Sequence, residues 1–110
     1  MTDANFVLEK LEFARLNLLE DDPTPDELGR ALESILKVEN WVKHPQDGDA
    51  VFDIRVDDSL LHLGKLRDEL AQEYQPTNIG PASLPVEAQL RLLRAVLRAW
   101  FSIYDWQQSQ

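Results

Sequence analysis

The sequence predicts an all-α protein, an antiparallel four-helix bundle formed by a single domain over residues 1–110. Three observations favour this fold class. Four segments repeat apolar residues at helical spacing, and turn-forming residues separate these segments. Only one short segment alternates like a β-strand, and no second segment is suited to pair with it. The helices are predicted over residues 3–20, 25–43, 50–74 and 84–107.

The helix over residues 25–43 has the clearest boundaries. Thr24 is a good N-cap, Pro25 suits the first helical position, and Glu27 lies where a capping box needs it. Pro45 then stops the helix. On a helical wheel the apolar side chains share one face, and the opposite face is predicted to be polar, with Arg30, Glu33, Ser34, Lys37 and Asn40.

Three aromatic residues lie off the main apolar faces of the first two helices. Phe6 and Phe13 are nearly opposite the apolar face of the helix over 3–20, and Trp41 lies on the polar side of the helix over 25–43. Each is expected either to pack within the chain or to anchor a partner, since aromatic residues are enriched at interfaces. Because of these aromatics we expect a homodimer rather than a monomer.

The start of the helix over 50–74 has two interpretations. The stretch VFDIRVD alternates apolar and charged residues, as a strand does. Phe52 and Val56, however, share the helical phase of Leu60, which favours one helix with Asp49 as its cap. Whether residues 50–57 are helix or strand therefore stays open, with helix preferred.

The helix over 84–107 is predicted to begin after a Ser83 cap and to be the most apolar of the four. Its apolar arc covers more than half of the circumference, which predicts a helix that touches three neighbours. The alternative is that a second subunit or a partner covers part of this arc. A narrow ridge of three arginines interrupts the apolar arc of this helix: Arg91, Arg94 and Arg98. We expect these arginines to pair with acids of neighbouring elements.

The charge and composition indicate a protein partner. The net charge is −9 and the chain has no cysteine. Such a negative charge opposes binding to nucleic acid or to an anionic membrane, and it suits a basic partner. The first ten residues lack the basic and apolar regions of a secretory signal, so we expect a cytoplasmic protein.

The motifs of common enzymes are missing from the sequence. There is no phosphate-binding glycine loop, no nucleophile elbow and no spacing typical of a metal site, so we expect no catalytic residue, metal or cofactor. The leading hypothesis is a small non-enzymatic protein-binding module of the adaptor, chaperone, immunity, antitoxin or inhibitor kind. A DNA-mimic inhibitor is one alternative. The predicted partner contacts are Phe6, Phe13, Trp41, Arg91, Arg94, Arg98 and Trp106.

One pair of residues supports an enzymatic alternative. Arg55 and His62 are seven residues apart, so they share a face of a continuous helix. This pair resembles the arginine–histidine signature of the HEPN ribonucleases, which are helical bundles. The resemblance covers these two residues alone. It implies a metal-independent ribonuclease in which the two side chains activate the ribose 2′-hydroxyl and stabilise the phosphate.

Overall fold

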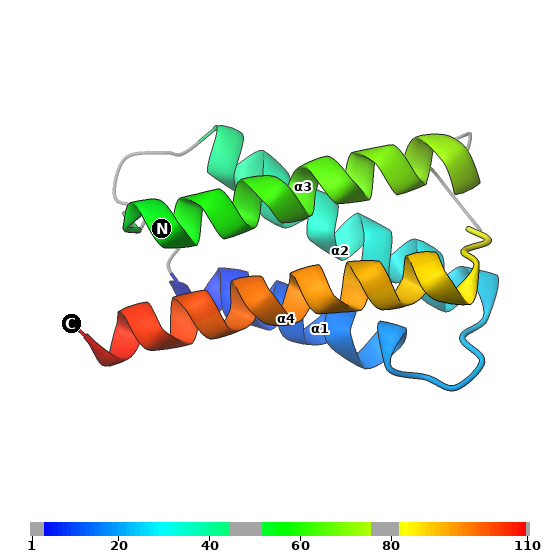
Figure 1. The fold of residues 1–110 in the computed structure, drawn as a ribbon, viewed down its shortest axis with the longest axis horizontal. Helices are drawn as coiled ribbons and strands as arrows, with labels where there is room; N and C mark the ends of the chain where they lie inside the picture. Colours follow the sequence, from blue (N-terminus) through cyan, green and yellow to red (C-terminus); the bar gives the residue numbers. More distant parts are fainter. Residues whose placement is uncertain (1–3, 45–51, 76–81, 110) are drawn as a thin grey trace.

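The computed structural model describes residues 4–44, 52–75 and 82–109, and in these ranges it confirms the all-α four-helix bundle. The helices are α1 (Ala4–Leu18), α2 (Pro25–Lys43), α3 (Ile54–Tyr74) and α4 (Val86–Gln108). Successive helices run in opposite directions (Figure 1). No strand occurs in the described ranges, so the strand interpretation of residues 52–57 is wrong; residues 50 and 51 lie outside those ranges.

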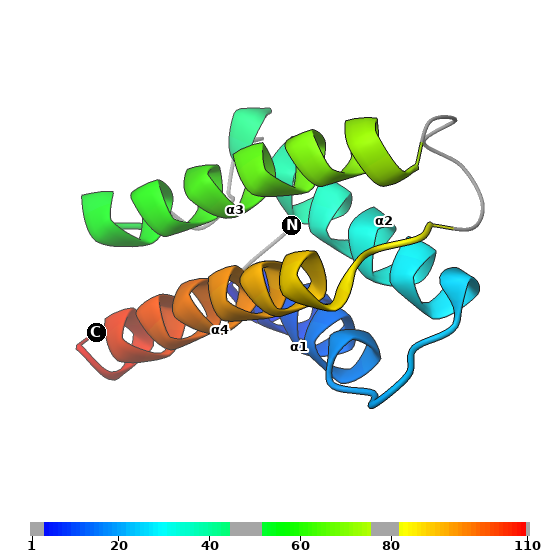
Figure 2. The same ribbon diagram turned by 45° about the vertical axis from the view of Figure 1, so that its right-hand side comes forward.

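Each helix packs against two others. The contacting pairs are α1–α2, α2–α3, α3–α4 and α1–α4, and the two diagonal pairs do not meet. In both views α1 and α4 lie side by side, with α2 and α3 forming the other half of the bundle (Figures 1 and 2). A single cluster of buried apolar side chains fills the centre. This arrangement leaves every helix with an outer side that no neighbour covers.

The capping box of α2 is present as predicted. The Thr24 hydroxyl accepts a hydrogen bond from the Glu27 N–H at 3.1 Å, and the Thr24 N–H donates to the Glu27 carboxylate at 3.0 Å. Pro25 occupies the first turn. These local contacts fix the start of the helix, and its observed bounds coincide with the predicted ones.

The start of α3 differs from the prediction. Phe52 and Asp53 are not helical, and the helix begins at Ile54. Asp53 is the N-cap, with its carboxylate accepting from the Val56 N–H at 3.0 Å. Asp49 lies outside the described residues. Phe52 is nevertheless buried, because an extended residue at a helix entrance can reach the same core that a helical residue would.

The start of α4 also differs. Pro85 occupies the N-cap position and no side chain caps this helix. Ser83 instead donates its backbone N–H to the Tyr74 carbonyl at 3.2 Å, which ties the entrance of α4 to the end of α3. The predicted Ser83 cap is therefore wrong. The first helix is also slightly shorter than predicted, since it ends at Leu18.

Three buried polar side chains join different helices. Gln89 of α4 donates to the Leu18 carbonyl at 2.8 Å, at the end of α1. Ser34 of α2 donates to the Lys10 carbonyl at 2.7 Å. The predicted exposed position of Ser34 is wrong because α1 covers that edge of α2. The third, Arg67 of α3, donates to a carbonyl of α2 at 3.2 Å.

Glu39 of α2 is buried against α3. Its side chain lies where a Cβ on Gly64 would be only 2.9 Å from the Glu39 Cγ, so the glycine makes room for the carboxylate. Lys43 pairs with Glu39 at 2.6 Å. Burial raises the pKa of Glu39, Lys43 opposes that rise, and the nearby Asp68 adds to it. Nothing in the spacing of the sequence distinguishes this glutamate from those that face solvent.

Candidate functional site

The outer side of α4 carries four exposed large apolar side chains, more than any other helix of the described ranges. Its core side holds Leu92, Val96, Ala99 and Ile103, which are buried. Because α4 packs only against α1 and α3, the prediction of three neighbours is wrong. The part of the apolar arc left uncovered contains Val86, Leu90, Phe101 and Tyr104.

These side chains form a line along the helix. Leu90, half-buried Leu97 and Tyr104 are seven residues apart, and Phe101 lies four residues after Leu97. Leu90 is 45% exposed, Phe101 55% and Tyr104 44%. Residues at this spacing share one side of a helix. The uncovered line therefore extends over most of the length of α4.

The ring of Trp100 packs against two of these aromatic rings. Its ring stacks on Tyr104 with centroids 5.4 Å apart and planes 8° apart. It also meets Phe101 edge to face, at 5.2 Å and 88°. Both are favourable aromatic geometries. Phe101 and Tyr104 are thus exposed on a half-buried support and have little side-chain freedom left to lose on binding.

Helix α1, which packs beside α4, carries apolar and charged side chains outside the core. Leu19, next to the end of α1, is 49% exposed, and half-buried Leu8 packs against the core. Between them on the chain, Arg15 hydrogen-bonds to the Glu12 carboxylate. This bond lowers the pKa of Glu12 and raises that of Arg15. This part of α1 is therefore apolar at Leu8 and Leu19 and carries a charged pair between them.

The arginine ridge beside the apolar line is exposed. Arg91, Arg94 and Arg98 form no ion pair with any acid of the described ranges. The predicted pairing with acids of neighbouring elements is therefore not found there. Three guanidinium groups remain available at the border of the apolar surface.

Trp41 and Trp106, both predicted as partner contacts, pack on the same ring, that of Phe52. The ring of Phe52 lies 5.5 Å from that of Trp41 and 4.9 Å from that of Trp106. Both tryptophans are half-buried and pack on the core. Trp41 Nε1 is buried without a hydrogen-bond acceptor in the described ranges. Phe52, just before α3, thus bridges a tryptophan of α2 and one of α4.

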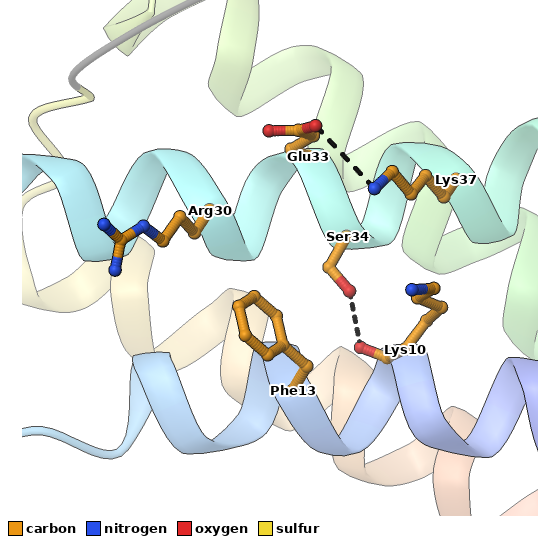
Figure 3. A pocket seen from close by; sticks show the side chains of 6 residues that line it. All are labelled: Lys10, Phe13, Arg30, Glu33, Ser34 and Lys37. Atoms are coloured by element: carbon orange, nitrogen blue, oxygen red, sulfur yellow. Dashed lines mark hydrogen bonds and ion pairs between the residues drawn. The ribbon is translucent and has the colours of Figure 1, made fainter.

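The remaining predicted contacts lie on the other side of α1. Half-buried Phe6 has the Lys10 ammonium 5.5 Å from its ring centroid. Phe13 is 45% exposed and lines a groove of about 190 Å³ between α1 and α2 (Figure 3). Arg30 and Lys37 come from α2 to the same groove, where Lys37 lies 3.8 Å from Glu33. The structure thus separates Phe6 and Phe13 from the apolar line of α4.

A second groove, of about 400 Å³, lies between α3 and α4. It brings Arg55 and His62 together, as their spacing predicts, and adds Arg98 and Ser102 from α4. The spacing of residues within α3 contains no signal for this contribution from α4. Asp58 also lines the groove, so a carboxylate lies among the cationic groups.

Neither a metal-binding group nor a membrane-spanning helix occurs in the described ranges. They contain no group of three His, Asp or Glu side chains placed to hold a metal ion. None of the four helices has the length and apolar character that crossing a bilayer would require. Compared with known proteins, the chain matches no protein-family model, no curated protein sequence and no solved structure.

Proposed function

We propose that the protein is a cytoplasmic, non-enzymatic protein-binding module that binds through the outer side of α4. The observation that carries this proposal is the aromatic group of Trp100, Phe101 and Tyr104, in which two exposed rings are fixed by a half-buried third. Rigid aromatic side chains supply much of the energy of protein interfaces. An apolar line of this length is uncommon on a small soluble monomer.

The chemistry of this surface favours a protein over other macromolecules. A nucleic acid or an anionic membrane would approach against nine net negative charges. A protein can cover the apolar line and also place acidic side chains near Arg91 and Arg94. Since apolar contacts dominate such a complex, we expect it to persist when the salt concentration is raised. A complex formed by a DNA mimic would instead dissociate.

Capture from the native host tests the proposal. Three baits are compared: the wild type, Phe101→Ser, and the control Leu61→Ser, which removes an apolar side chain of similar exposure (48%) from α3. We expect the same protein to be retained by the wild type and by Leu61→Ser, and to be lost with Phe101→Ser. Equal retention by all three baits would contradict the proposal.

A metal-independent ribonuclease is the second candidate function. It is favoured by one observation, the groove that Arg55 and His62 share with Arg98 and Ser102. In such a site the imidazole would take the proton of a ribose 2′-hydroxyl while the guanidinium groups hold the phosphate. Asp58 in the same groove opposes phosphate binding, so this candidate ranks second. It requires RNA cleavage by the wild type that His62→Ala abolishes, and an inactive wild type would refute it.

A further inference from the structure

We infer that the partner of the α4 surface is a second copy of the chain, paired through α4 in antiparallel orientation. This inference rests on the proposed function, since it uses the same surface. Seven residues of α4 are separated alternately by three and four positions, the spacing of a coiled-coil seam. All of them are exposed except Leu97, which is half-buried. The seven residues are Glu87, Leu90, Arg94, Leu97, Phe101, Tyr104 and Gln108.

The charges in this seam select the orientation. In a parallel pair each Arg94 would face the Arg94 of the second copy, and each Glu87 its own equivalent, so like charges would meet. An antiparallel pair avoids both contacts. With the twofold axis near residue 99, Leu97 faces Phe101 of the second copy and Arg94 faces the Tyr104 ring, where a cation–π contact forms.

The flanking positions agree with this register. Arg91 comes beside Asp105 of the second copy, and the twofold axis makes this favourable contact twice. Arg98 lies nearest the axis and faces its own equivalent, the one unfavourable contact of the pair. In the monomer neither Arg91 nor Arg98 has an ion pair in the described ranges.

The dimensions suit a reversible dimer. The 23 residues of α4 span about 34 Å, and a strip one helix diameter wide covers about 340–400 Å² on each copy. Stable interfaces bury about 800 Å² on each partner. The surface is therefore smaller than that of a stable interface, and the Arg98 contact and the net charge of −9 on each copy both oppose association, so we expect a weak, reversible dimer.

Analytical ultracentrifugation over the micromolar range tests the inference. We expect the wild type and Leu61→Ser to shift from the monomer mass of 12.7 kDa to twice that mass as concentration rises. Phe101→Ser should weaken the association about tenfold or more, because the dimer loses two equivalent rings. Arg98→Gln should strengthen it. Circular dichroism shows whether each variant folds.

Cross-linking tests the orientation, since the chain has no cysteine of its own. Leu90→Cys mixed with Gln108→Cys should be joined by a short bis-maleimide. Leu90→Cys alone should not be joined, because in the antiparallel pair its two thiols are about 27 Å apart. Cross-linking of Leu90→Cys alone, with none between Leu90→Cys and Gln108→Cys, would overturn the antiparallel arrangement.

The two proposals fail in different ways. A wild type that stays monomeric at every concentration overturns the second-copy inference. If capture then retains another protein that Phe101→Ser loses, the proposed function stands with a different partner. A dimer that Phe101→Ser leaves unchanged also overturns the inference, because the interface then lies elsewhere.

Discussion

Substituting Gly64 by alanine tests the close contact between α2 and α3. An alanine Cβ at this position would lie 2.9 Å from the Glu39 Cγ and 3.1 Å from its Cδ and Oε2. Overpacking of this kind costs about 1–3 kcal/mol, whereas replacing a helical glycine by alanine gains about 1 kcal/mol. Gly64→Ala alone should therefore leave the free energy of unfolding unchanged or lower it by up to about 2 kcal/mol.

A second background separates the two effects. In the Glu39→Ala background the side chain that obstructs the new Cβ is gone. Adding Gly64→Ala there should raise the free energy of unfolding by the full helix-propensity gain of about 1 kcal/mol. Urea unfolding of the four proteins, followed by circular dichroism at one protein concentration, gives the coupling energy. We expect a coupling of about 1–3 kcal/mol. If Gly64→Ala had the same effect in both backgrounds, the close contact between Gly64 and Glu39 would be refuted.

Three further predictions concern stability. Thr24→Ala removes the bond that the Thr24 hydroxyl accepts from the Glu27 N–H and should lower the free energy of unfolding by about 1 kcal/mol, measured by urea titration; an unchanged midpoint would refute it. Gln89→Ala leaves the Leu18 carbonyl without its donor and should cost about 1–3 kcal/mol, whereas exposed Gln72→Ala should cost much less. Burial raises the pKa of Glu39 above its ordinary 4.5, so the folded state holds that proton more tightly and wild-type stability falls as pH rises through the raised value. Glu39→Gln cannot titrate, and its stability relative to the wild type should rise from acidic to neutral pH; a constant difference would contradict this.

Local signals in the sequence were sufficient for most of the fold. The boundaries of α2 follow from Thr24, Pro25 and Glu27, which act within one turn of each other. The start of α3 could not be predicted in the same way. Phe52 has the correct helical phase although it is not helical, and the cap is Asp53 where the sequence had suggested Asp49. The choice depends on how the chain enters the core, which is a tertiary property.

The surface of α4 was predicted only in part. A helical wheel finds the wide apolar arc, but the number of helices that cover it depends on the whole packing arrangement. The exposure of Phe101 and Tyr104 therefore required the structure. The α3–α4 groove could be predicted only in part for the same reason. The spacing of Arg55 and His62 contains no information about Arg98, which reaches the groove from α4.

Isotope-filtered NMR tests the central claim most directly. In a mixture of labelled and unlabelled protein, nuclear Overhauser effects can be restricted to contacts between two copies. The proposed pair predicts such an effect between the Tyr104 ring of one copy and the Arg94 side chain of the other, residues that lie about 15 Å apart along one helix. Effects that join other surfaces, or none between copies at a concentration where ultracentrifugation shows a dimer, would contradict pairing through α4.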